Sequence, residues 1–562
     1  MSEDFAILIL FILGFLCVLC VAGAFFKKRQ RRKGEKEYQN EKNKLSHPSQ
    51  PETPGIEKPP VVTALEKHCT DKGKPKFLFL DSGCVCMETK ELKQLWDYCK
   101  DNSILLTFPE DGYAEIRLLS ESDEYKQTAD FILKNKETYD YYFITSGLKR
   151  LFSCTDSGLR APLPQEKSCF VFCNAFRYAE FVKYVKARSK DTIYVYCQDH
   201  CFSGSLPESF CSLERLKNEE KLFCETAFCT LDKKNEALEK LHLAHHLNTA
   251  ISNPEKIYIG EKAYELMKLE SLKEAGGGNA QGGEGRLYYL DEEKKRLLKL
   301  YKFFPSEAKV DKLKLLIEIG RNHPDLARNV AFPIELAYDA ENQCIGFTMQ
   351  NFMEANCSNL KSLNLRHYYD FNTIASHEKS KIKRIFFNHF LIVKKLAILY
   401  LELEFAGIYQ IDFACENIIV HDSDNNPTVF IVDIDCVQVD LYLSAAYRLE
   451  LLHPDLEVSP NDTIQVKDIL SQNLREPHHT EFQFFVTALQ TILIVPAVIG
   501  DESWSQTNRY SLSDKEPSID AVEHRWQSIF KEGTAHREVF SNELHHRACY
   551  TIGDLCLCCE LV

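Results

Sequence analysis

Three polar residues, Asp412, Asn417 and Asp433, stand in otherwise apolar sequence and have side chains suited to phosphate chemistry. A carboxylate on a loop, as at Asp412, can accept or orient the proton of a hydroxyl group. A carboxamide and a carboxylate together, as at Asn417 and Asp433, can share a hard cation with phosphate oxygens. The alternative is a β-hairpin in which these residues only form turns.

The sequence around these residues predicts a loop, a strand, a tight turn and a second strand. Asn417 opens the apolar run NIIV, and a polar turn follows from Asp422 to Pro427. The second apolar run, VFIV, ends at Asp433. A hairpin of this kind brings Asn417 and Asp433 to the same end of its two strands.

A glycine-rich segment precedes another strand, turn and strand. GGEG at 282–285 is followed by RLYYL, a charged turn, and LLKLY, which contains Lys299. Glycine amides have no Cβ in the way and can approach phosphates closely. Lys299 lies within an apolar strand, so its ammonium needs an anion, either a phosphate or a glutamate of the next helix. Of Glu307 and Glu318 on that helix, we prefer Glu318 because it lies in the apolar stretch LLIEIG.

Composition places the chain among ordinary multidomain globular proteins. It has 562 residues, of which 44% are hydrophobic and 27% charged, and its net charge is −14. The acidic balance argues mildly against general nucleic-acid binding. The 22 cysteines are scattered, which indicates reduced thiols rather than a disulfide scaffold.

The first residues predict a membrane anchor. Phe5–Phe26 contains no charge and is long enough to span a bilayer as a helix. The basic run Lys27–Lys33 follows it, and the residues before it are acidic, which is the reverse of a signal peptide. The positive-inside rule then predicts a single-pass membrane protein with its N-terminus outside and the bulk of the chain in the cytoplasm.

Residues 75–229 are expected to form an α/β domain. Apolar strand candidates at 77–80, 103–108, 139–145 and 192–196 alternate with helical segments, which favours a parallel sheet of Rossmann-like type. The carboxyl ends of such strands are where sites form, and Asp81 and Asp199 lie just beyond strand ends, while Glu115 lies in a segment that starts a helix.

The acidic residues of this domain make it resemble, weakly, a PIN-like nuclease, in which carboxylates hold a divalent metal. The resemblance implies metal binding by Asp81, Glu115 and Asp199, and a nucleic-acid substrate. A haloacid-dehalogenase-like phosphatase is a second resemblance, but DSG stands where DxD is expected. The alternative is an α/β module whose acidic residues are solvated loop residues.

Residues 276–500 resemble the protein kinase superfamily, most closely bacterial kinase-like proteins with a GGEG loop and D-x-D in place of D-F-G. The resemblance implies that Asp412 positions the acceptor hydroxyl and that Asn417 and Asp433 bind magnesium. The residues it assigns to nucleotide binding are Gly282, Gly283, Glu284, Gly285 and Lys299. It also implies ATP and Mg²⁺ as cofactors and a protein as substrate.

This sequence departs from the kinase pattern at two points. Gln410 and Ile411 replace the usual His and Arg before Asp412, and Ile434 and Asp435 replace Phe and Gly after Asp433. The first change puts control by activation-loop phosphorylation in doubt, and the second puts the Phe-driven switch in doubt.

We therefore expect a multidomain protein with a transmembrane helix, an α/β domain and an α+β two-lobed kinase-like domain. Its expected function is that of a membrane-anchored signalling kinase that phosphorylates Ser/Thr hydroxyls. The alternatives are a nucleotide-binding pseudokinase scaffold and a regulator of an attached PIN-like nuclease. The expected domains are the transmembrane helix 5–26, a linker 27–74, the α/β domain 75–229, a helical connector 230–275, the kinase-like domain 276–500 and a C-terminal extension 501–562 with a Cys cluster.

Overall fold

The structure is a computed structural model, and its described residues are 58–138, 142–145, 167–172, 193–197, 211–212, 249–272, 284–353, 356–373, 379–409, 414–423, 426–439, 442, 483–484, 487–488 and 491. Several predictions fall outside these residues. They concern Asp199, Gly282, Gly283, Asp412 and the Cys cluster near the end of the chain.

The first sheet is a parallel sheet, as predicted. Its strand order is β3-β2-β1-β4-β5-β6, and only β6 runs antiparallel to its neighbour. The apolar run FLFL forms the central strand β1 (Phe77–Leu80). The other strands are β2 (Leu105–Pro109), β3 (Tyr142–Thr145), β4 (Ser168–Phe172), β5 (Ile193–Cys197) and β6 (Cys211–Ser212). The four predicted strands match β1, β2, β3 and β5, whereas β4 and β6 were not predicted.

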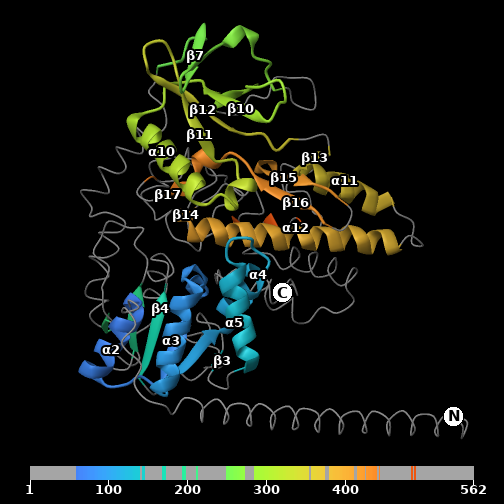
Figure 1. Ribbon diagram of the computed structural model, residues 1–562. Helices are drawn as coiled ribbons and strands as arrows, with labels where there is room; N and C mark the ends of the chain where they lie inside the picture. The colour runs from blue at the N-terminus through green and yellow to red at the C-terminus, as the bar shows by residue number, and fades with distance from the viewer. Residues whose placement is uncertain are drawn as a thin grey trace, which may run out of the picture. The chain divides into compact units, whose positions relative to one another are not determined.

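Helices lie beside this sheet (Figure 1). They are α2 (Pro60–Lys72), α3 (Thr89–Asp101), α4 (Glu110–Leu119) and α5 (Lys126–Thr138). Helix α3 is amphipathic and buries Leu92, Leu95, Trp96 and Cys99, which recur at the spacing of one helix face. Nine cysteines among the described residues are free thiols.

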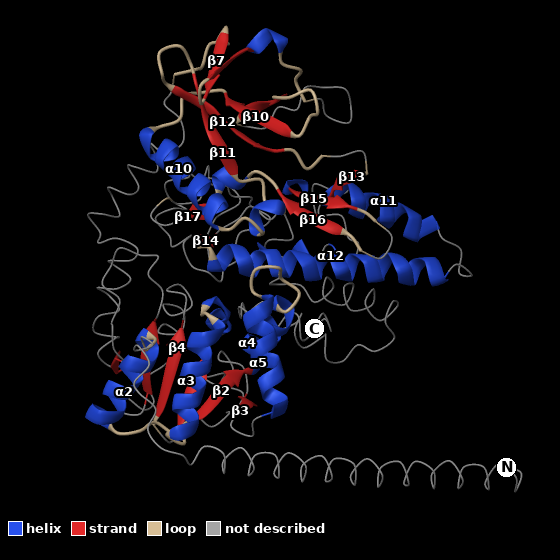
Figure 2. Ribbon diagram, viewed as in Figure 1, coloured by secondary structure: helices blue, strands red, loops and turns tan. Residues whose placement is uncertain are grey.

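The second sheet is antiparallel, with the order β8-β7-β11-β12-β10-β9 (Figure 2). Its strands are β7 (Lys256–Ile259), β8 (Lys262–Glu265), β9 (Gly285–Tyr289), β10 (Arg296–Tyr301), β11 (Pro333–Tyr338) and β12 (Cys344–Gln350). Strands β9 and β10 confirm the predicted strand, turn and strand after the glycine segment.

The prediction of a helical connector at 230–275 is wrong for residues 256–265, which form the β7–β8 hairpin. The physical reason is an alternating pattern: Ile257 and Ile259 are buried, whereas Lys256 and Tyr258 are exposed. That period of two is the period of a strand.

The alternation of β10 decides where Lys299 points. Leu298 and Leu300 join one hydrophobic core, and Leu297 and Tyr301 join another on the opposite face. Helix α10 (Glu307–Asn322) covers the second face with Leu313 and Ile317. Lys299 alternates with Leu298 and Leu300, so it shares the face of Tyr301 that α10 covers.

Helices and short strands follow this sheet in the sequence. They are β13 (Cys357–Asn359), α11 (Leu360–Thr373), α12 (Lys379–Phe405), β14 (Ile408–Tyr409), β15 (Ile418–His421), β16 (Thr428–Ile431) and β17 (Gln438–Val439). The long helix α12 is followed by Gly407, whose φ of 78° favours glycine. The predicted hairpin is confirmed as β15 and β16.

The transmembrane prediction needs correction. Among the described residues, the structure has no helix that is both long enough and apolar enough to cross a bilayer. The predicted span, 5–26, lies outside those residues. With no such helix among the described residues, we withdraw the transmembrane helix and the single-pass localisation.

Replacing Gly346 by alanine is expected to lower the free energy of unfolding by about 3 kcal/mol. A Cβ at Gly346 would lie 2.1 Å from the carbonyl oxygen of Lys299, a backbone atom that cannot rotate away. Urea denaturation measures the loss. The control is Gly112→Ala in α4, where the nearest atom to the new Cβ would be 3.5 Å away, at ordinary contact distance. Equal effects of the two substitutions would contradict the packing described for β10 and β12.

His389 on α12 is expected to make stability fall in acid. Its buried Nδ1 lies 2.8 Å from the Thr491 carbonyl oxygen, to which it must donate, and its Nε2 lies 2.6 Å from Nδ1 of His367. Burial, with the neighbouring His367, lowers the pKa of His389 from 6.5 to about 3.

Because the unfolded chain then binds the proton more tightly, His389 destabilises the fold increasingly as the pH falls from about 6.5 toward 3, by at most about 1.4 kcal/mol per pH unit. Urea titrations between pH 7 and pH 5 are expected to show a steeper loss for the wild type than for His389→Asn. Parallel pH profiles would show that His389 does not titrate in this way.

Candidate functional site

The β15–β16 hairpin places Asn417 and Asp433 at one end, as the sequence predicted. Ile418 pairs with Ile431, and the next amide along, Val432 N–H, donates to the Asn417 carbonyl oxygen at 2.9 Å. Asp433 follows directly with a φ of 63°, a left-handed conformation uncommon outside glycine, asparagine and aspartate. The hairpin register therefore fixes the position of both residues.

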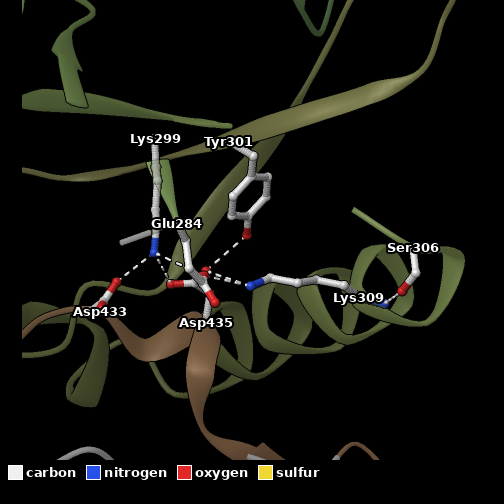
Figure 3. Close-up of polar contacts among 7 residues, drawn as sticks. All are labelled: Glu284, Lys299, Tyr301, Ser306, Lys309, Asp433 and Asp435. Atoms are coloured by element: carbon white, nitrogen blue, oxygen red, sulfur yellow. Dashed lines mark hydrogen bonds and ion pairs between the residues drawn. The ribbon is translucent and has the colours of Figure 1, made fainter. Parts of the chain in front are cut away.

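Lys299 meets the carboxylates that follow this hairpin (Figure 3). Its Nζ lies 2.6 Å from Oδ1 of Asp433 and 2.7 Å from Oδ1 of Asp435. The prediction that this buried ammonium needs an anion is confirmed. The predicted partner was wrong, because Glu318 is exposed on α10, away from the face that packs on the sheet.

Asp435 is the centre of a buried ionic network. Its side chain is 0% exposed, and the Tyr301 hydroxyl donates to its Oδ2 at 2.9 Å. Lys309 of α10 lies 3.4 Å from the same oxygen and donates to Glu284 Oε2 at 2.8 Å. Figure 3 shows Lys299 and Tyr301 of β10 and Lys309 of α10 pointing toward this carboxylate. Neither Lys309 nor Asp435 was predicted as a site residue.

The charges in the network determine the protonation of its members. Burial alone would raise the pKa of Asp435, but Lys299 and Lys309 more than reverse this and lower it. Burial would lower the pKa of Lys299, but Asp433 and Asp435 outweigh it and raise that pKa well above the ordinary value. For Glu284, burial is the largest single effect and raises the pKa, but Lys309 and Lys299 together outweigh it, and the pKa falls to about 2. These three groups are therefore charged at neutral pH.

Asp433 is held less firmly than Asp435. Lys299 lowers the pKa of Asp433, but burial and the neighbouring Asp435 together raise it above the ordinary value. Its side chain is 44% exposed, whereas that of Asp435 is fully enclosed. Of the two aspartates, Asp433 is thus the one that an incoming cation can reach.

A cavity of about 250 Å³ opens beside the network. Its polar end is formed by Glu284, Lys299, Asn417 and Asp433. The rest of its wall is mostly apolar and includes Leu287, Leu297, Ala331, Met349, Ile419 and Val432. An apolar cleft with a few charged groups at one end is the usual form of a small-molecule site.

Two sets of residues could bind a metal ion. Asn417 and Asp433 line the cavity and offer the oxygen ligands that Mg²⁺ prefers. Ligand atoms of Glu284, Asp435 and Cys436 lie within 4.8 Å of one another, but Lys309 already contacts both carboxylates. The first pair fits a magnesium ion better because it includes the more exposed carboxylate.

Asp81 and Glu115, two of the three acidic residues predicted for the α/β domain, are buried in local structure. The amide of Gly83 donates to Asp81 Oδ2 at 3.2 Å, which caps a short turn after β1. The Ser82 hydroxyl donates to Glu115 Oε2 of α4 at 2.5 Å. The structure thus brings Asp81 and Glu115 to the same strand end through Ser82, and Asp111, which the sequence prediction missed, is buried in α4 as well. Metal binding by these residues remains a prediction.

Comparisons with known proteins leave the function open. No protein-family model matches the chain, and no curated protein does. Among solved structures, a rhoptry kinase from Toxoplasma gondii is similar over 60% of this chain and 95% of that chain, with 14% sequence identity and a TM-score of 0.32. At that score the similarity is too weak to assign a fold or an activity, so the function must be argued from the residues themselves.

Substituting Asp435 by asparagine is expected to cost about 3–5 kcal/mol of stability, because it leaves two buried ammonium groups without their shared carboxylate. The matched substitution Asp433→Asn is expected to cost about 1 kcal/mol or less, since its partly exposed side chain leaves Lys299 still paired. Urea denaturation of both variants measures the difference. Similar losses would contradict the central place given to Asp435.

Proposed function

We propose that the chain is a protein kinase that transfers the γ-phosphoryl group of ATP to a protein Ser or Thr hydroxyl. The observation that supports this most is the placing of Lys299, an ion-paired lysine held by a buried carboxylate at the charged end of an apolar cavity. A paired strand lysine and a metal-binding aspartate are the parts that kinases use on ATP phosphates.

Each part of the cavity has a task in this proposal. The apolar wall takes the nucleotide base, and Lys299 contacts the phosphates. Asp433 and Asn417 hold a magnesium ion, which neutralises charge on the phosphate oxygens. Asp412, outside the described residues, is assigned from the sequence to position the acceptor hydroxyl. Phosphoryl transfer needs mainly positioning and charge stabilisation, which these groups supply.

The contact between Lys299 and Asp433 must change when the nucleotide binds. One ammonium cannot hold Asp433, Asp435 and a phosphate equally well, because its three donors are limited in direction. Asp433 would hold a magnesium ion, which would supply the positive charge that Lys299 supplies there now. Lys299 would stay paired with Asp435 and direct its remaining donors to the phosphate.

Asp433→Asn is expected to reduce phosphoryl transfer at least about a hundredfold, because it removes the charged magnesium ligand. The full chain is incubated with Mg²⁺ and γ-labelled ATP, and label on the chain itself or on dephosphorylated casein is counted. Lys299→Met is the second variant, and Lys314→Met is the control because Lys314 lies exposed on α10.

Transfer that survives Asp433→Asn unchanged would contradict the mechanism. A wild-type chain that binds Mg-ATP but transfers no label would instead support the nucleotide-binding scaffold.

A further inference from the structure

The GGEG segment contains a carboxylate, Glu284, that lines the cavity. Glu284 stands directly before β9, its side chain is 27% exposed, and it lines the polar end of the cavity. A free carboxylate there would repel ATP phosphates, since like charges a few ångströms apart in a poorly hydrated site repel strongly. Something must therefore neutralise Glu284 and fix its direction.

Lys309 supplies that charge from α10. Its side chain is 2% exposed, and its Nζ contacts Glu284 Oε2 at 2.8 Å and Asp435 Oδ2 at 3.4 Å. Lys299 is farther from Glu284, at 3.9 Å. The backbone of Lys309 is fixed too, because its amide donates to the Ser306 hydroxyl at the start of the helix, at 3.2 Å.

Lys309 does not line the cavity, so it acts on a nucleotide only through its two partners. One partner belongs to the glycine segment, and the other belongs to the segment that carries Asp433. Lys309 therefore connects α10 to Glu284, directly before β9, and to Asp435 in the 433–435 segment (Figure 3). Helix α10 supplies the cation, Lys309, and the GGEG segment supplies the anion, Glu284. Lys299 stays paired with Asp435 and lines the cavity.

We propose that Lys309 is a positioning residue for phosphoryl transfer: it holds Glu284 and Asp435 in place, so that Gly285 at the start of β9 and Lys299 are aligned on the phosphates of bound ATP. This inference rests on the proposed kinase function. A merely structural role would be to neutralise buried carboxylates without affecting the rate of the folded protein.

The test is a double-mutant cycle on the full chain with Lys309→Met and Glu284→Gln. We expect Lys309→Met to lower kcat by about tenfold to a hundredfold, because a displaced loop spoils the alignment of the reacting groups. Glu284→Gln is expected to lower kcat similarly. The double variant is expected to match the less active single variant within about twofold, since each substitution removes the contact between Lys309 and Glu284. Lys309→Arg should recover much of the loss.

Rates are expressed per folded protein from the amplitude of thermal unfolding, and Lys314→Met on the same helix is the control. A kcat of Lys309→Met equal to wild type, or losses that multiply in the double variant, would overturn the inference. If Lys309→Met does not fold, Glu284→Gln tests the same contact by changing the partner of Lys309. A normal kcat in that variant overturns the inference, and a fall at unchanged melting temperature supports it.

This outcome can be told apart from failure of the proposed function. If the wild type transfers label and Lys309→Met does so equally well, only the role of Lys309 is refuted. If the wild type transfers no label from Mg-ATP to itself or to dephosphorylated casein, the kinase function is refuted and the positioning role with it.

Discussion

The buried carboxylate of Asp435 is the interaction on which the rest of the site depends. It accepts from Tyr301 and Lys299 of β10 and contacts Lys309 of α10. Three charged side chains enclosed in apolar surroundings are stable only as a closed network, because an unpaired charge there is very costly. The network therefore fixes the sheet, the helix and the 433–435 segment against one another.

The network also divides the work between two neighbouring aspartates. Asp435 is fully enclosed and holds the lysines, whereas Asp433 has an exposed side chain at the cavity. Asp433 has a left-handed backbone, with a φ of 63°, and both aspartates contact Nζ of Lys299. An enclosed carboxylate and a partly exposed carboxylate thus stand in one short D-I-D segment. The chain needs no glutamate on α10 to hold Lys299, since Asp435 does so.

The sequence predicted the positions of Asn417, Asp433 and Lys299 better than the residues that hold them in place. Alternation and a polar turn were enough to place Asn417 and Asp433, and the cost of an unpaired ammonium was enough to give Lys299 an anion. The identity of that anion depends on contacts distant in sequence, and a glutamate was chosen where an aspartate is found. The positions of two lysines on α10 could have indicated that buried carboxylates lie nearby. The buried stripe of α10 consists of Lys309, Lys312, Leu313, Leu316 and Ile317, so two lysines lie on its apolar face.

The most direct test is a crystal structure of the full chain with Mg²⁺ and a non-hydrolysable ATP analogue. Our account predicts an Asp433 oxygen about 2.1 Å from the magnesium ion. It also predicts that Lys299 still contacts Asp435 and now contacts a phosphate oxygen. A nucleotide bound elsewhere, or Asp433 still paired with Lys299 and free of metal, would contradict it.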